Sequence, residues 1–564
     1  MISTGDEPLQ LDSSRGRWVL TVTILGSAIA LLEATVVNVS LPAIGRHLDA
    51  DLGDLQWVIT GYLITLASLI LLGGSLGDRL GRRRIFEVGV IWFTVASLAC
   101  AVAPTIELLI VARVVQGIGG ALLTPGSLAI IEASFRREDR ARAIGTWSAL
   151  GGIAAAVGPL LGGWLVDAVS WRAIFLLNLP IGVLIVWASR RYVPESRDPD
   201  EAGRLDVWGS VLVTAGLAGG TFALIQAPER GGTSPLVLAS AVVAISSLVG
   251  FVVLERRMAH PMLPLELFRS RQFTGANLVT FVVYAALSGV FFLLAVFLQI
   301  SLGYSAIESG AASLPVTVLM LALSSRMGAL AQRIGPRLPL TIGPVLIAGG
   351  TLLMRGIDIG DSYWTSVLPA VVVFGLGLSL VVAPVTATVL AAADDRHAGI
   401  ASGVNNAVAR TAGLLAVAAL PLVAGLASSD YEDPELLAEA FDTAMLVMAA
   451  LAAAGGVLAF ATIRRALLEE TGGDEPTTPP HHCAVAGTPL HARSRQAAGR
   501  AAQVAATSQG GEPTTVSTQN GHRSRTHRPA FDGGPDDVGR RPSRSSTGAC
   551  PPSTETQTGE GVHR

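Results

Sequence analysis

GGSLGDRLGRRR, residues 73–84, is a short charged segment that separates two long apolar stretches. Its charges lie on Asp78, Arg79 and Arg82–Arg84, and it also holds four glycines. Glycines let helix ends approach closely, and a carboxylate can cap a helix or pair with an arginine of a neighbouring helix. Basic residues also anchor a loop on the inner side of a membrane. The pattern G-x-L-x-D-R-x-G-R-R is more specific than such an anchor requires, which indicates a dedicated structural element.

The composition of the chain places this segment in a membrane protein. Hydrophobic residues make up 50% of the 564 residues and charged residues only 15%, whereas a soluble domain carries about 25% charged residues. Apolar runs of about 20 residues recur, and each is long enough to cross a bilayer core of about 30 Å as a helix. The sequence therefore predicts an all-α, multi-pass membrane protein and excludes water-soluble enzyme folds.

The apolar runs predict fourteen transmembrane helices, with both termini on the cytoplasmic side. The expected spans are 18–44, 55–76, 85–104, 107–133, 142–168, 172–190, 206–227, 234–255, 273–300, 306–326, 338–356, 362–390, 398–426 and 439–463. In this orientation the outer connections hold only Arg46, Arg172, Arg230 and Arg355, and the inner ones hold many more arginines. This asymmetry satisfies the positive-inside rule.

Charge and cysteine usage exclude several kinds of partner. The net charge of -3 is too small to indicate a nucleic-acid partner. All 40 basic residues are arginine, so the chain can build neither a lysine-containing phosphate loop for ATP nor a Schiff base with a cofactor. Cys100, Cys483 and Cys550 lack disulfide or zinc spacing, and HHC at 481–483 is more simply incidental than a metal site. We expect no metal, cofactor, nucleic acid or ATP.

The beginning of the chain and its amino-acid usage add two expectations. The first residues lack a basic segment and a cleavage site, so we expect no cleaved signal peptide. Arginine in place of lysine, with abundant alanine and glycine, is typical of a bacterial genome of high GC content. The expected location is the plasma membrane of a bacterium.

An internal repeat divides the chain into two halves. GSLGDRLGRR at 74–83 aligns with GALAQRIGPR at 328–337, and both segments fall in predicted cytoplasmic loops. Equal sidedness indicates a parallel repeat, with two bundles related by an axis along the membrane normal. If each bundle has six helices, the spans 206–227 and 234–255 remain as extra helices between them.

The expected domain boundaries follow from this division. They are a cytoplasmic N-terminus at 1–17, an N-terminal six-helix bundle at 18–191, a linker with the two extra helices at 192–272, a C-terminal six-helix bundle at 273–465 and a disordered cytoplasmic tail at 466–564.

LLEATVVNVSLP, residues 31–42, places the carboxyl group of Glu33 inside the first apolar run. A charge at membrane depth costs on the order of 2.5–3.5 kcal/mol on insertion scales, so such residues find partners and mark functional sites. Burial and a neighbouring arginine have opposite effects on the proton affinity of a carboxyl group. A group subject to both can gain and lose a proton in the working pH range.

Several segments, in the expected order, resemble the major facilitator superfamily. The loop at 73–84 resembles its signature loop, LIVARVVQGIGGALLTP at 109–125 its helix 4 motif, and VGPLLGGWL at 157–165 the helix 5 motif of antiporters. LLEATVVNVSLP is similar to the helix 1 motif of the fourteen-helix drug:proton antiporter branch. Further similar segments are QWVITGY at 56–62, WRAIFLLNLPIG at 171–182, LQISLGYSAIESGAASLP at 298–315 and AGIASGVNNAVARTAG at 398–413. The resemblance covers about residues 18–465 and leaves the tail unexplained.

The chain departs from the family pattern at two positions. Glu33 stands where the usual helix 1 residue is aspartate, which keeps the charge and lengthens the side chain. Gln332 occupies the place of Asp78 in the second copy of the repeat, so we expect an asymmetric cytoplasmic gate.

The resemblance implies roles for individual residues. Glu33 is expected to carry the coupling proton and Arg113 to tune it; the alternative is a structural ion pair that locks helix 1 to helix 4. The expected gate residues are Gly74, Asp78, Arg79, Gly81, Arg82 and Arg83. The bend formed by Gly158, Pro159, Gly162 and Gly163 is expected to seal the bundle and favour exchange, although small residues also serve ordinary helix packing.

The candidate lining of a substrate cavity is polar or aromatic. It comprises Asn38, Trp57, Tyr62, Gln116, Asn405, Asn406 and Arg410. Aromatic faces attract cationic drugs, but Trp57 fits an interfacial anchor or a packing residue equally well.

The sequence thus predicts a proton-coupled exporter of drugs, antibiotics or related small molecules that works by alternating access. The partners expected are the substrate, protons and the lipid bilayer. No pattern of nucleophile and base or of metal ligands lies at membrane depth, so an enzyme is not expected. The alternatives are a dedicated exporter of one metabolite or self-made antibiotic, a nutrient importer, and a membrane sensor that transports nothing.

Overall fold

A computed structural model describes residues 8–197, 206–258, 261–393, 398–426, 431 and 433–464. These residues form helices and connections, and their only β-type pairing is an isolated bridge between Leu9 and Phe135. The predicted tail at 466–564, the HHC segment and Arg465 lie outside the described residues. All helices belong to the compact unit Met1–Thr477.

The first half of the chain forms one bundle of helices. Its members are α1 (Ser14–Leu48), α2 (Leu52–Leu80), α3 (Arg82–Val102), α4 (Ile106–Ser134), α5 (Arg137–Ala168), and the broken pair α6 (Arg172–Leu176) and α7 (Asn178–Tyr192). Side chains cap several of these helices: Ser13 accepts from Gly16 N, and Asp51 accepts from Asp54 N at 2.8 Å.

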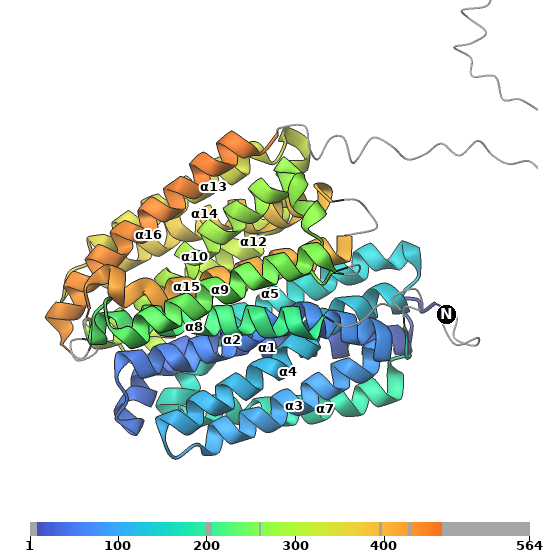
Figure 1. Ribbon diagram of the computed structural model, residues 1–564, viewed down its shortest axis with the longest axis horizontal. Coiled ribbons are helices and arrows are strands. Elements are labelled where there is room, and N and C mark those ends of the chain that lie inside the picture. The colour runs from blue at the N-terminus through green and yellow to red at the C-terminus, as the bar shows by residue number, and fades with distance from the viewer. Residues whose placement is uncertain are drawn as a thin grey trace, which may run out of the picture. The chain divides into compact units, whose positions relative to one another are not determined.

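The second half forms a corresponding bundle (Figure 1). Its members are η1 (Leu265–Arg269), α10 (Arg271–Ile300), the broken pair α11 (Ala306–Ala312) and α12 (Leu314–Ile334), α13 (Arg337–Arg355), η2 (Tyr363–Val367), α14 (Leu368–Ala391), α15 (Ala398–Ala424) and α16 (Pro434–Thr462). Between the bundles in sequence lie α8 (Val207–Arg230) and α9 (Pro235–Arg257), the two predicted extra helices.

Helix lengths confirm the predicted class of fold. Thirteen segments among the described residues are long and apolar enough to cross a membrane. The remaining long helix, α5, contributes the shorter apolar stretch Val157–Ala168. Together these helices agree with the predicted two six-helix bundles plus two extra helices. The domain boundaries between the bundles and the linker, at 191/192 and 272/273, remain predictions.

Two of the spans are broken by proline. Pro180 has no N–H to bond to the carbonyl of Leu176, and α6 ends and α7 begins between these residues. Pro315 likewise follows the junction of α11 and α12 at Ser313. The first break places Asn178 in the opening turn of α7, where its side chain points into the bundle.

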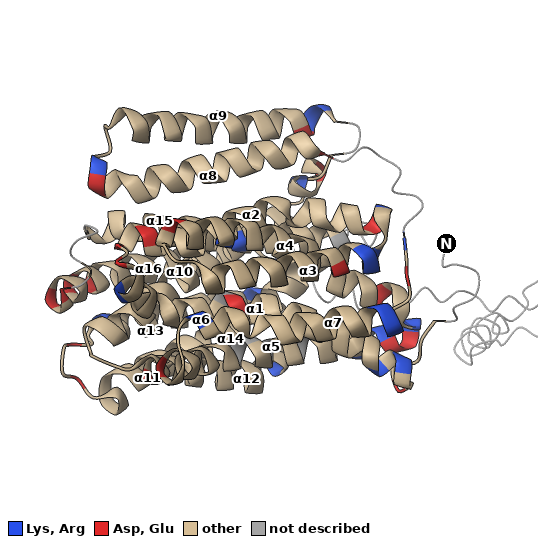
Figure 2. Cartoon of the chain, turned by 90° about the horizontal axis from the view of Figure 1, so that it is seen from below, with Lys and Arg blue, Asp and Glu red and all other residues tan. Residues whose placement is uncertain are grey.

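The α8–α9 hairpin lies along one side of the other helices (Figure 2). α8 packs against α2 and α15, whereas α9 packs mainly on α8 and leaves most of its surface exposed. Trp57 of α2 belongs to this contact, because its ring lies 6.3 Å from that of Phe222 in α8. Of the alternatives predicted for Trp57, this contact supports the packing position.

The two ends of the helices differ in charge and packing. The end at which α1 begins, here called the basic end, carries most of the arginines (Figure 2). At the opposite end the bundles are joined: Tyr431 OH donates to the Ala50 carbonyl at 2.9 Å, and Gln299 Nε2 donates to the Val39 carbonyl at 2.9 Å. Asp167 of α5 accepts from Ile307 N of α11 at 2.8 Å.

Glycine allows the backbones of α5 and α11 to touch at this joined end. A Cβ on Gly163 would meet the carbonyl oxygen of Ala306 and would lie 2.6 Å from the Cα of Ile307. Gly310 of α11 has the same relation to the carbonyl of Pro159 in α5. Any side chain at these positions must push the two bundles apart.

Gly163→Ala is expected to open the joined end. Spin labels at Arg46→Cys in α1 and Glu435→Cys in α16 report the separation of the bundles there, and the variant should add a population at longer distance. Gly145→Ala in the same helix is the control, because a Cβ there meets nothing within 4 Å. Identical distance distributions for the two variants would contradict the proposed contact.

Candidate functional site

The carboxyl group of Glu33 lies at the centre of the first bundle in an ion pair with Arg113. Arg113 Nη1 of α4 is 2.5 Å from Glu33 Oε1 of α1. The same arginine donates from Nε to the Val58 carbonyl of α2 at 2.9 Å. Three helices are thus tied together by one guanidinium group, whose fixed fork of donors suits several acceptors at once.

Polar side chains complete the hydrogen bonding around this pair. Asn178 Nδ2 of α7 donates to Glu33 Oε2 at 2.8 Å, and Arg113 Nη1 donates to Gln116 Oε1 at 2.6 Å. Gln116 Nε2 and Asn178 Nδ2 both donate to Ser97 Oγ of α3, at 2.8 and 3.2 Å. The network therefore includes α1, α2, α3, α4 and α7.

The pair is closed off from solvent. Glu33 is 4% exposed and Arg113 1% exposed. The Tyr62 ring lies beneath the guanidinium, 4.4 Å from its carbon to the ring centroid, and Phe175 lies on another side at 5.9 Å. A buried charge is tolerated only when it is paired and hydrogen-bonded, and this pair meets both conditions.

Sequence reasoning proposed Glu33 with Arg113 and missed Ser97 and Asn178. The resemblance placed Glu33 and Arg113 in the same bundle, and the structure brings them into direct contact. Asn178 carried a usable signal, because an asparagine inside an apolar run, two residues before a proline, must find a hydrogen-bond partner. Ser97 carried none, since serine is common in membrane helices.

The predicted gate loop forms ion pairs at the basic end. Arg82 Nε lies 2.7 Å from Asp78 Oδ1, one turn away. Gly81 has a φ of 119°, which favours glycine, and a Cβ there would meet the Glu195 carboxylate at 2.6 Å. Arg83 donates from its backbone N to Glu195 Oε1 at 3.1 Å. Glu195, in the segment after α7, is a partner of this loop that sequence reasoning missed.

Four of the predicted gate residues line a cavity. Gly74, Asp78, Arg79 and Arg82 line it, and Arg83 turns away to donate to the Val193 carbonyl at 3.1 Å.

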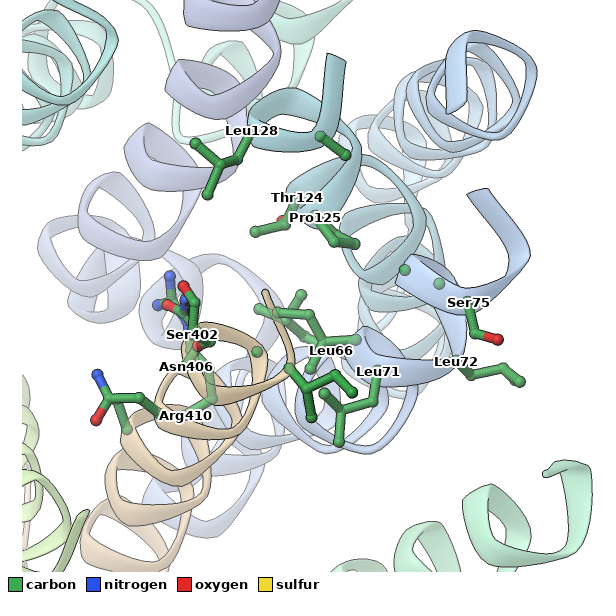
Figure 3. A pocket seen from close by; sticks show the side chains of 18 of the residues that line it. Leu66, Leu71, Leu72, Ser75, Thr124, Pro125, Leu128, Ser402, Asn406 and Arg410 are labelled. Atoms are coloured by element: carbon green, nitrogen blue, oxygen red, sulfur yellow. Dashed lines mark hydrogen bonds between the residues drawn. The ribbon is translucent and has the colours of Figure 1, made fainter. Parts of the chain in front are cut away.

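This cavity has a volume of about 2030 Å³ and is lined by helices of both bundles and by the α8–α9 hairpin. Its lining runs from the middle of the helices to the basic end. Figure 3 shows Ser402, Asn406 and Arg410 of α15 on one side, with Leu66 of α2 next to them and Thr124 and Leu128 of α4 across from them. The cavity therefore reaches the basic end, whereas the two bundles are in contact at the opposite end.

The predicted cavity residues divide into two groups. Asn405, Asn406 and Arg410 line the cavity, and Asn405 also accepts from Thr280 Oγ1 at 2.8 Å. Tyr62 and Gln116 instead belong to the buried network around Arg113. Trp57 packs on α8, and Asn38 in α1 is half-buried outside the lining.

The helix 5 motif lies between the two bundles. Gly158 and Gly162 face α1, where added Cβ atoms would meet Thr35 and, at 2.7 Å, Val36. Pro159 and Gly163 face α11 of the other bundle. The motif thus joins a helix that carries Glu33 to a helix across the bundle boundary.

Comparison with known proteins identifies the family. Residues 23–418 match the family description Major Facilitator Superfamily. The chain belongs to this superfamily. The predicted resemblance is therefore confirmed over most of the transmembrane region.

Relatives with established names are resistance and export proteins. The methylenomycin A resistance protein of Streptomyces coelicolor is 37% identical, over 72% of this chain and 85% of its own length. The multidrug resistance protein Stp of Mycobacterium tuberculosis is 36% identical, over 69% of this chain and 72% of its own. The probable actinorhodin transporter of Streptomyces coelicolor is 37% identical, over 78% of this chain and 77% of its own length. These names support an efflux transporter of small molecules and confirm that the chain is not an enzyme.

Solved structures support the fold alone. An auto-inhibited peptide transporter of the POT family superposes with a TM-score of 0.59 at 17% identity, covering 79% of this chain and 96% of its own. A bacterial homologue of the human drug peptide transporters PepT1 and PepT2 gives a TM-score of 0.58 at 14% identity. The superposition covers 81% of this chain and 100% of the homologue.

Removing the guanidinium of Arg113 is expected to destabilise the bundle strongly. Arg113→Met leaves the Glu33 carboxyl buried without its partner, which typically costs about 3–5 kcal/mol. The double variant Glu33→Gln with Arg113→Met removes both charges and should recover part of that loss. The measurement is the unfolding free energy in mixed micelles, with the exposed Arg46→Met as control. Equal unfolding free energies of the single and double variants would show that the unpaired Glu33 carboxyl is not the cause of the destabilisation.

Proposed function

We propose that this protein is a proton-coupled exporter of small molecules that works by alternating access. The observation that carries the proposal is the buried pair of Glu33 and Arg113, in contact at 2.5 Å and separated from the cavity lining. Buried ion pairs add little stability compared with apolar side chains of similar size. A role for this pair in transport therefore explains its presence better than stability does.

The coupling step follows from the contacts of the pair. A proton on Glu33 removes the attraction to Arg113 and leaves the guanidinium with the Val58 carbonyl and Gln116 as acceptors. α1 is then held less tightly to α4. Because α1 packs against α5 at Gly158 and Gly162, and α5 against α11, a shift of α1 reaches the boundary between the bundles. Protonation thus favours separation of the joined end, and substrate leaves there.

The basic end is the cytoplasmic side in this proposal, and the membrane is the bacterial plasma membrane. The excess of arginines at that end supports the assignment. Substrate enters the cavity from the cytoplasm while the opposite end is joined. The gate loop closes the basic end in the other state, and the ion pair of Asp78 with Arg82 and the contacts of Arg83 to Glu195 hold its present conformation.

The proton gradient supplies the work. At 100 mV each charge moved across the membrane contributes about 2.3 kcal/mol. That energy sustains a concentration ratio of about fiftyfold for each net charge. No ATP and no cofactor enter this scheme.

A dedicated exporter is the second candidate. The names of relatives include a methylenomycin A resistance protein and a probable actinorhodin transporter, each tied to one compound. A narrow substrate range would identify this case, whereas export of unrelated compounds would identify a multidrug transporter.

Glu33→Gln is expected to abolish transport driven by a pH gradient, because the amide cannot take up the coupling proton. Inverted vesicles with an acidic lumen should accumulate a panel of anionic and cationic dyes and antibiotics through the wild type and not through the variant. Glu33→Asp keeps an acid and should retain part of the transport. The exposed Glu107→Gln is the matched control and should transport normally.

A second readout separates coupling from folding. Glutamine is neutral like the protonated Glu33, so Glu33→Gln should retain exchange of substrate without a gradient. Undiminished gradient-driven accumulation by Glu33→Gln would reduce the pair to a structural role.

A further inference from the structure

The guanidinium of Arg410 is a positive charge within the cavity, at the middle of the membrane. Arg410 lies near the centre of α15 (Ala398–Ala424) and belongs to the cavity lining. Among the described residues it has no ion pair and no hydrogen bond, although it is partly buried. An ionisable side chain at this depth marks a functional site, and here the described residues supply no carboxylate partner for it.

Arg410 is also the only charged side chain that the described helices α10, α12, α14 and α15 contribute to the lining. The carboxylates of the lining lie on other elements, toward the basic end, and have other neighbours. Asp78 pairs with Arg82 at 2.7 Å, and Glu266 lies 3.9 Å from Arg269. Glu132, at the end of α4, lies within electrostatic reach of Arg82 and Arg140.

Two further lining carboxylates hold the α8–α9 hairpin. Asp206 Oδ1 caps α8 by accepting from Gly209 N at 2.8 Å, and Glu255 Oε2 accepts from Leu263 N at 3.2 Å. Glu33, the acid at membrane depth in the first bundle, is enclosed with Arg113 and is not part of the lining. The middle of the cavity therefore has a net positive charge from Arg410.

The surroundings of Arg410 suit one chemical class. Ser402, Asn406 and Arg410 follow one another at intervals of four residues and lie on one face of α15, as Figure 3 shows. The rest of this region is mainly apolar. Leu63, Leu66, Phe291, Met320 and Leu378 line it. Binding sites for small molecules combine an apolar wall with a few polar groups that fix orientation.

We propose that Arg410 anchors an anionic group of the substrate, a carboxylate or phenolate carried on an apolar body, with Asn406 and Ser402 beside it as hydrogen-bonding groups. A guanidinium binds a carboxylate with two parallel hydrogen bonds between opposite charges, an arrangement that is weaker with a neutral acceptor and that a cationic group does not offer. The inference deepens the proposed function and rests on it for transport, whereas binding at this site can be measured without transport.

The test is equilibrium binding to the purified full-length protein in lipid nanodiscs at neutral pH. Fluorescein and rhodamine 123 share a xanthene ring system, but the first is an anion and the second a cation. The wild type is expected to bind fluorescein about tenfold more tightly. Arg410→Gln should weaken fluorescein binding by about tenfold and leave rhodamine 123 binding nearly unchanged. Arg410→Lys keeps the positive charge but loses the two parallel hydrogen bonds, so it should retain only part of the fluorescein affinity.

Two controls keep the result specific. Arg269→Gln removes a positive charge from the mouth of the same cavity and should change fluorescein affinity less than about twofold, because it is exposed and lies beside Glu266. Melting curves show whether each variant is folded, and Arg410→Lys serves if Arg410→Gln is not.

Three outcomes overturn the anion site: no saturable binding of fluorescein by the wild type, equal or tighter binding of rhodamine 123, or unchanged fluorescein affinity in the folded Arg410→Gln variant. Failure of the proposed function is distinct. Fluorescein binding that depends on Arg410, without gradient-driven transport of any probe in vesicles, would retain the site and reject proton-coupled export.

Discussion

The ion pair of Glu33 with Arg113 is the interaction on which the first bundle depends. A charge at membrane depth must find a partner, and each partner here is itself hydrogen-bonded to another helix. Arg113 reaches the Val58 carbonyl of α2, and Glu33 accepts from Asn178 of α7. The pair therefore sets the relative positions of α1, α2, α4 and α7, and a change in its charge is felt by all of them.

Close backbone contact transmits that change to the second bundle. Glycines let the backbone of α5 touch the backbone of α11, and they let it pack closely on the Thr35 and Val36 side chains of α1. Asp167 adds hydrogen bonds from α5 to the start of α11. The joined end is thus built from rigid contacts with few intervening side chains, which suits an element with two discrete arrangements.

Charge is distributed differently in the two bundles. The first bundle encloses its membrane-depth charges as a neutral pair, whereas the second presents Arg410 to the cavity. In the proposed mechanism this asymmetry separates two tasks: one bundle takes up the proton and the other faces the substrate. A further difference between the halves is that the second repeat loop has Gln332 where the first has Asp78.

The sequence by itself determined the class of fold, because apolar runs of membrane-spanning length and the repeated loop leave few alternatives. It also predicted a role for Glu33, since a carboxyl group inside an apolar helix must find a partner. Only the tertiary structure decided which polar residues meet. It brought Asn178 and Ser97 to the ion pair, enclosed Tyr62 and Gln116 with it, placed Trp57 against α8, and left Arg410 facing the cavity. The physical reason is rotation about each helix axis: a sequence shows how deep a residue lies in the membrane, but packing decides which neighbour its side chain faces.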